Sequence, residues 1–159
     1  EGLAGEPFLF WQHLANAGLI EGNYTGVAGA SSIFHHVIGV NAPRSKMNNA
    51  GWGFSFIGNS LGDAATFALD YGNLFWFGTV YAPTSHRTQH NILKPEEAWN
   101  VDTKVDDGRP ATGKVIVRSE LAAWASAGNC STATSQTDLA GVYNLSSSTV
   151  ACALMIRQQ

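Results

Sequence analysis

Residues 73–81 carry the clearest strand pattern in the chain: Asn73-Leu74-Phe75-Trp76-Phe77-Gly78-Thr79-Val80-Tyr81. The run is apolar on both faces, which is typical of a central strand that is covered on both sides. Pro83 follows and is expected to end the strand, because proline cannot donate to a sheet ladder. The sequence therefore predicts a β-sheet with this segment in its interior.

Further short strands are expected before and after this segment. Residues 52–57 alternate aromatic and small side chains, and residues 114–118 form a short apolar run. Residues 149–156 are expected to form the last strand. Weaker strand patterns occupy residues 33–40 and 65–69.

An N-terminal helix is predicted over residues 7–17. Pro7 suits the first helical position, and apolar side chains then recur three and four residues apart, as on one helical face. Gly18 is expected to end this helix as a C-terminal cap. The glycine-rich residues 21–50 that follow predict a long irregular loop, with strand character only at residues 33–40.

A second helix is predicted over residues 95–106. Pro95 begins it, and two acidic residues follow in the first turn, where the helix dipole favours negative charge. Ala98, Val101 and Val105 share one face of this helix, and Asp107-Gly108 is expected to end it. The order of helix, loop, strands, helix and strands predicts an α+β fold with an antiparallel sheet, in one domain over residues 1–159.

Composition limits the class of protein. Hydrophobic residues make up 45% of the 159 residues and charged residues 13%, with a formal net charge of −3. A disordered chain would carry more charge and fewer aromatic residues. The sequence has no basic stripe, so a nucleic-acid partner is not expected. It also has no window that is long and apolar enough for a membrane span. These features are typical of extracellular and surface proteins.

Cys130 and Cys152 are the two cysteines of the chain. A metal site would call for closer cysteine pairs or nearby histidines, and a redox pair would call for a two-residue spacing. A structural disulfide remains, and closing this loop would stabilise the fold by roughly 3 kcal/mol. The pair therefore predicts an oxidising compartment.

The acidic cluster Asp102, Asp106 and Asp107 is the calcium candidate of the sequence, since hard cations bind clustered carboxylates. Its spacing differs from that of an EF-hand loop. Lys104 and Arg109 lie close enough in sequence to neutralise the cluster, so a helix end with surface ion pairs is the alternative interpretation.

Other candidate residues carry weaker patterns. His86 and His90 are four apart, a spacing that binds zinc on a helix, but their surroundings indicate a loop. His35 and His36 would point to opposite sides of a strand, which disfavours a joint site. Gly53 to Gly58 superficially resembles a serine nucleophile elbow around Ser55, with the second glycine one residue late. Glycan acceptor patterns occur at three asparagines: Asn23, Asn129 and Asn144.

Three stretches resemble bacterial proteins with a prepilin-type N-terminal segment, the type IV pilin-like and pseudopilin-like proteins. They are residues 10–20 (FWQHLANAGLI), residues 95–115 (PEEAWNVDTKVDDGRPATGKV) and residues 151–154 (ACAL). The second stretch is the most specific. Together they span most of the chain in the expected order.

The resemblance implies a globular pilin-like head in which an N-terminal helix packs on an antiparallel sheet and a disulfide closes the C-terminal region. It implies a non-catalytic subunit of a type IV pilus-like filament or a secretion pseudopilus, outside the bacterial cell or in the periplasm before assembly. The expected partners are identical or homologous pilin subunits, with no nucleic acid and no cofactor. The hydrophobic N-terminal helix of such proteins is expected to have been removed or to lie on a separate chain.

A secreted or surface binding module, such as an adhesin or a carbohydrate-binding protein, is the alternative. Exposed aromatic rings at Tyr24 and Trp52 would support it, because aromatic faces stack on sugar rings. An enzyme is not expected from these motifs.

Overall fold

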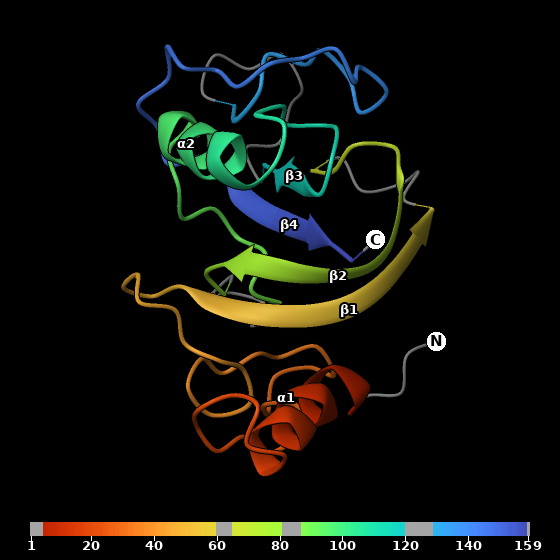
Figure 1. The fold of residues 1–159 in the computed structure, drawn as a ribbon, viewed down its shortest axis with the longest axis vertical. Helices are drawn as coiled ribbons and strands as arrows, with labels where there is room; N and C mark the ends of the chain where they lie inside the picture. The colour runs from red at the N-terminus through yellow and green to blue at the C-terminus, as the bar shows by residue number, and fades with distance from the viewer. Residues whose placement is uncertain (1–4, 60–64, 81–86, 120–128, 159) are drawn as a thin grey trace.

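The computed structural model describes residues 5–59, 65–80, 87–119 and 129–158. Its elements follow the order α1 (Glu6–Asn16), β1 (Gly51–Asn59), β2 (Asp70–Gly78), α2 (Pro95–Val105), β3 (Val115–Arg118) and β4 (Ala153–Arg157). The chain therefore has the predicted α+β composition. Figure 1 shows α1 at one end of the long axis and α2 at the other, with the sheet between them.

The four strands form one sheet in the order β1-β2-β4-β3. Every neighbouring pair is antiparallel, with Phe54 opposite Phe75 in the first pair and Phe77 opposite Leu154 in the second. The last strand of the chain is thus inserted between β2 and β3. The predicted antiparallel sheet is confirmed, and β2 has the interior position that its apolar run indicates.

The strand β2 ends at Gly78, earlier than the sequence suggested. Thr79 makes an isolated antiparallel bridge with His90. A side chain at Gly78 would collide with this returning segment, because its Cβ would lie 2.4 Å from the carbonyl oxygen of His90. A close approach between two backbones therefore defines this end of the strand, and Tyr81 and Pro83 lie outside the described residues.

The main core lies between the sheet, α2 and the C-terminal region. Its largest fully buried side chains are Trp76, Phe67, Leu74, Ile116 and Met155. The Nε1 of Trp76 donates a hydrogen bond of 2.7 Å to the Oγ of Ser55 on β1. This pairing satisfies a buried indole N–H and fixes the register of β1 and β2 at their centre.

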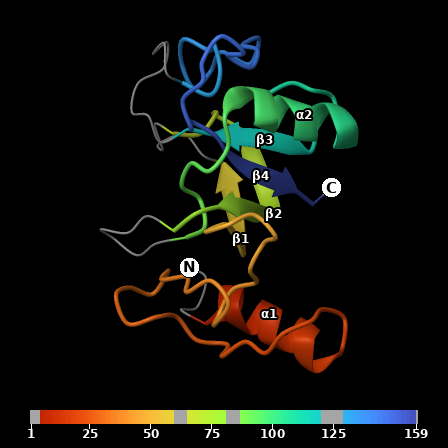
Figure 2. The same ribbon diagram turned by 90° about the vertical axis from the view of Figure 1, so that its left-hand side faces the viewer.

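The helix α1 begins and ends as predicted, with Pro7 in its first turn and Gly18 in the left-handed conformation (φ 69°) just after it. Its buried residues, Phe8 and Trp11, lie outside the main core cluster. The ring of Phe10 stacks on Phe54 of β1, with centroids 4.2 Å apart. Figure 2 shows α1 together with the loop that follows it, at the end of the molecule away from α2.

The strand expected at residues 33–40 is absent from the structure. The reason is Asn41, whose side chain is 1% exposed. Its Oδ1 accepts the backbone N–H of Val37, and its Nδ2 donates to the carbonyls of Val27 and His35. Local side-chain bonds of this kind compete with a sheet ladder, so the segment forms turns instead.

The weak strand expected at residues 65–69 is also wrong. Phe67 is buried, but the backbone makes single bonds to distant segments, such as Ala68 N–H to the carbonyl of Gln136. The predicted last strand is confirmed only for its second half, since residues 149–152 lie outside β4. Within the described residues, no helix is long and apolar enough to cross a membrane.

Candidate functional site

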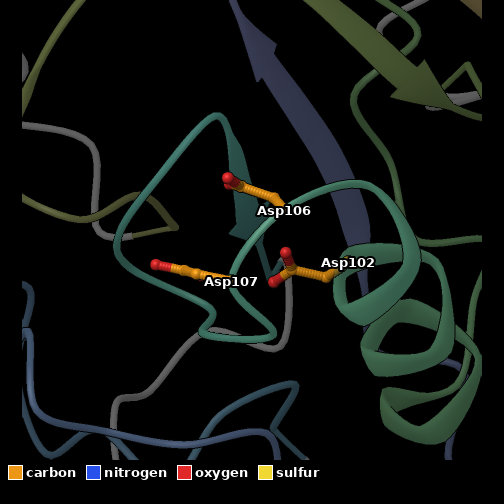
Figure 3. Close-up of side chains that lie close together, drawn as sticks. All are labelled: Asp102, Asp106 and Asp107. Atoms are coloured by element: carbon orange, nitrogen blue, oxygen red, sulfur yellow. The ribbon is translucent and has the colours of Figure 1, made fainter.

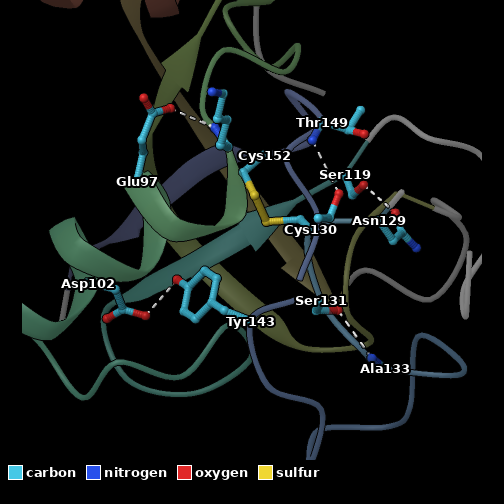
Figure 4. Close-up of a disulfide and its surroundings, with 12 residues drawn as sticks. Glu97, Asp102, Ser119, Asn129, Cys130, Ser131, Ala133, Tyr143, Thr149 and Cys152 are labelled. Atoms are coloured by element: carbon cyan, nitrogen blue, oxygen red, sulfur yellow. Dashed lines mark hydrogen bonds between the residues drawn. A yellow bond between two sulfur atoms is a disulfide. The ribbon is translucent and has the colours of Figure 1, made fainter. Parts of the chain in front are cut away.

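The two cysteines form the predicted disulfide. The Cα atoms of Cys130 and Cys152 are 5.1 Å apart, and both residues are fully buried. The backbone N–H of Cys152 donates to the carbonyl of Leu93, and its carbonyl accepts the N–H groups of Ile92 and Leu93, just before α2. The disulfide therefore joins two parts of the C-terminal region (Figure 4), and the backbone hydrogen bonds of Cys152 attach this region to the segment that leads into α2. A disulfide indicates an oxidising, non-cytoplasmic location.

A second link between the C-terminal region and α2 is a buried hydrogen bond. The Oη of Tyr143 donates to the Oδ2 of Asp102 over 2.7 Å, and the backbone N–H of Gly108 donates to Oδ1 over 3.2 Å. Asp102 is 0% exposed and Tyr143 is 4% exposed. Figure 4 shows this pair on the same face of α2 as the disulfide. Both oxygens of the buried carboxyl are thus satisfied, as burial requires.

This arrangement corrects the expected orientation of α2. The sequence placed Ala98, Val101 and Val105 on one apolar face, yet Val101 and Val105 are exposed. Ala98 and Asp102 are buried instead. The buried tyrosine explains the difference, because it gives a carboxyl group the hydrogen-bond partner that solvent would otherwise supply. Sequence analysis missed Tyr143, and no motif connects it to Asp102 across 41 residues.

Burial raises the pKa of Asp102 from 3.8 to about 6. The hydrogen bonds from Tyr143 and Gly108 oppose this rise, while the nearby charges of Asp107 and Asp106 add to it. Burial, with the hydrogen bond to Asp102, also raises the pKa of Tyr143. The pair therefore holds a carboxyl group that titrates close to neutrality inside the fold.

The other two aspartates organise the turn after α2. Figure 3 shows Asp106 and Asp107 beside Asp102, and one carboxylate oxygen of each of the three lies within 4.8 Å of the others. Asp106 accepts the backbone N–H groups of Lys114 and Val115. Asp107 accepts the N–H of Arg109 over 2.9 Å and the hydroxyl of Thr112 over 2.5 Å.

These bonds bear on the calcium hypothesis. The three carboxylates lie close together, but each already accepts hydrogen bonds from the protein: Asp102, Asp106 and Asp107. Calcium needs six to eight oxygen ligands, and binding here would compete with these bonds. The geometry favours a structural role at the helix end, made by backbone N–H groups and by the hydroxyls of Thr112 and Tyr143.

The remaining candidate residues are scattered. His86 lies outside the described residues, so the pair with His90 has no described geometry. Burial, and then the charge of Arg118, lowers the pKa of His90. Ser55 is buried in β1, and its hydroxyl accepts the bond from Trp76, which places it in the core rather than in a nucleophile elbow. His35 and His36 line one surface hollow, although neither lies in a strand.

The three glycan acceptor patterns differ in accessibility. Asn23 is exposed, whereas Asn129 and Asn144 are buried. Asn129 accepts a hydrogen bond from Ser119, and Asn144 accepts one of 2.7 Å from Ser146. Only the first position leaves room for a glycan in the folded protein.

No protein-family model, curated protein or solved structure matches the chain.

Proposed function

We propose that the chain is the head of a structural subunit of a bacterial type IV pilus-like filament or secretion pseudopilus. The observation that carries this proposal is that each end of the long axis has exposed apolar side chains, in addition to Phe56 on β1, which is 70% exposed. Isolated surface leucines and valines are ordinary. Apolar side chains that gather at two opposite ends are typical of an interaction surface.

The first of these surfaces is on α2. Val105 is 62% exposed, and Val101 and Trp99 are also exposed. The neighbouring C-terminal region adds Val142 and Leu145, each 52% exposed. Figure 1 shows this region and α2 together at one end of the molecule.

The second surface is at the α1 end. Leu9 on the helix is exposed, Leu19 just after it is 71% exposed, and Val27 in the following loop is 60% exposed. The two surfaces are built from different residues, so contact between them would be heterologous. Heterologous contacts that do not close into a ring generate open filaments. Two different apolar surfaces therefore suit a filament subunit better than a closed dimer.

The other features of the chain agree with this proposal. A disulfide suits a subunit exposed outside the cell, and the low charge suits packing against identical neighbours. In the proposed head, α1 packs on the sheet through Phe10 and Trp11, whose rings lie near Phe54 and Phe75. The hydrophobic N-terminal helix would hold the filament core, and homologous subunits would be the partners.

The alternative of a sugar-binding module has lost its expected support. Tyr24 is 8% exposed, and its hydroxyl donates to the carbonyl of Glu21. Trp52 is half-buried, with its ring 4.8 Å from that of Phe77. Tyr24 therefore offers no exposed ring, and Trp52 is only partly accessible, so neither is the exposed aromatic side chain that this alternative calls for.

Immunogold electron microscopy tests the proposed function. Antibodies against this head are applied to filaments sheared from cells that make the full-length protein. Label along the whole length would identify a major subunit, and label at the tips alone would identify a minor pilin or adhesin. Filaments without label, together with antigen that stays in the cell, would contradict the proposal.

A further inference from the structure

A surface hollow separates the loop after α1 from the end of β2. Its volume is about 470 Å³, and it is open to solvent. The hollow is shallow, so a ligand bound there would keep much of its surface in solvent. Its polar lining residues are two histidines, one arginine, one asparagine and one threonine, and none of the described residues that line it is acidic: His35, His36, Arg44, Asn49 and Thr79.

The ring of His35 is fixed by a hydrogen bond to its Nδ1. Its Nδ1 accepts the backbone N–H of Ser31 over 3.1 Å. The neutral ring must therefore carry its proton on Nε2, where it is a hydrogen-bond donor. Gly29 makes this placement possible, because a Cβ there would lie 2.5 Å from Nδ1.

Arg44 supplies the fixed positive charge of the hollow. Its Nη2 donates to the carbonyl of Ile38 over 3.3 Å, which holds the guanidinium above the turn at Gly39. A guanidinium has five donors and no acceptor, so this one bond leaves most of its donors for another group. The planar fork suits the two oxygens of a carboxylate or phosphate.

Apolar side chains complete the lining. Val37, Ile38 and Val80 contribute to it. Ile38 is seated against Gly51 at the start of β1, where a Cβ would lie 2.7 Å from the Cγ1 of the isoleucine. The hollow thus combines apolar surface with donors and a cation, in a chain whose net charge is −3.

The geometry points to a binding site for a small oxyanion-bearing molecule, with its carboxylate or phosphate on Arg44 and His35 and its body against Val37, Ile38 and Val80. This site is made of other residues than the two apolar surfaces, and the proposal does not rest on assembly into a filament. The feature that the lining selects is the anion, so molecules that share one body and differ in the anion can test it.

Nuclear magnetic resonance titration of the folded, disulfide-bonded chain tests the proposal with three probes: glucuronate, glucose 6-phosphate and glucose. The expected result is saturable shifts of the amides around the hollow with either anion and much weaker shifts with glucose. The ratio of the two anion affinities then distinguishes a carboxylate ligand from a phosphate ligand. Equal response to glucose, or no saturable shift with any probe, would overturn it.

Matched variants locate the effect. Arg44→Gln should weaken anion binding about tenfold or more, as expected for loss of a charge-assisted hydrogen bond. Arg109→Gln makes the same charge change at an exposed residue in the turn after α2 and should leave binding unchanged. Unaltered affinity in Arg44→Gln, or an equal loss in Arg109→Gln, would show that the hollow does not bind the anion. The amide spectrum of each variant reports whether it has folded.

Discussion

Replacement of Asp102 by asparagine should remove a specific pH dependence from the stability of the fold. The carboxyl group is fully buried, and its pKa is about 6 in place of 3.8. Below about pH 4 the group is protonated in both the folded and unfolded states. As the pH rises through 6, the unfolded chain is already ionised and the folded chain must ionise a buried group. The contribution of Asp102 to the free energy of unfolding is therefore about 2 to 3 kcal/mol less favourable at neutral pH than at low pH.

The Asp102→Asn side chain can satisfy both neighbours without a charge. Its Oδ1 can accept the N–H of Gly108, and its Nδ2 can donate to the hydroxyl oxygen of Tyr143, which rotates to accept. The variant should therefore match the wild type near pH 4 and exceed its stability by about 2 to 3 kcal/mol at pH 8. Urea unfolding at several pH values, with the disulfide intact, measures this difference.

A control variant separates burial from charge. Asp70→Asn makes the same chemical change at an exposed position of β2, and it should leave the pH dependence as in the wild type. Other carboxyl groups titrate in the same range, so the informative quantity is the difference between variant and wild type. If that difference is the same at pH 4 and pH 8, ionisation of Asp102 does not destabilise the folded state, and the reasoning is refuted.

Three further predictions concern the packing around this pair and the sheet. Tyr143→Phe should lower the free energy of unfolding by about 1 to 3 kcal/mol at pH 8, and by less at pH 5, because the lost bond is stronger when the acceptor is charged; an equal loss at both values would contradict this. Replacement of both cysteines by alanine should cost about 3 kcal/mol in urea unfolding, and an unchanged midpoint would show that the disulfide contributes nothing. Gly78→Ala should destabilise the fold more than Gly58→Ala does. The new Cβ would lie 2.4 Å from a carbonyl oxygen at Gly78, whereas at Gly58 it would only touch the ring of Phe56 at 3.8 Å. Similar melting temperatures of the two variants would argue against the close approach.

Local chemistry explains why much of the fold could be predicted from the sequence. Pro7 and Gly18 mark α1, and Pro95 with its two following glutamates marks α2. The apolar run around Trp76 indicates the interior strand. Each of these patterns depends on residues that are close in sequence, where propensity and spacing are informative.

The errors arose where particular side-chain hydrogen bonds, near or far along the chain, decide the structure. Asn41 binds the backbone of residues 33–40 from outside that segment and prevents a strand. Tyr143 turns Asp102 inward across 41 residues and exposes Val101 and Val105. The hollow at His35 and Arg44 depends on three separate segments. Spacing along the chain carries no signal for contacts of this kind.

Cysteine cross-linking in assembled filaments tests the proposed head-to-tail packing most directly. Leu19→Cys at the α1 end and Val105→Cys on α2 are introduced together into the full-length protein, and each single variant is the control. A ladder of cross-linked species from the double variant, with at most dimers from the single variants, is the predicted result. Cross-links confined to dimers in the single variants, with no ladder from the double variant, would mean that like ends meet and would contradict the filament account.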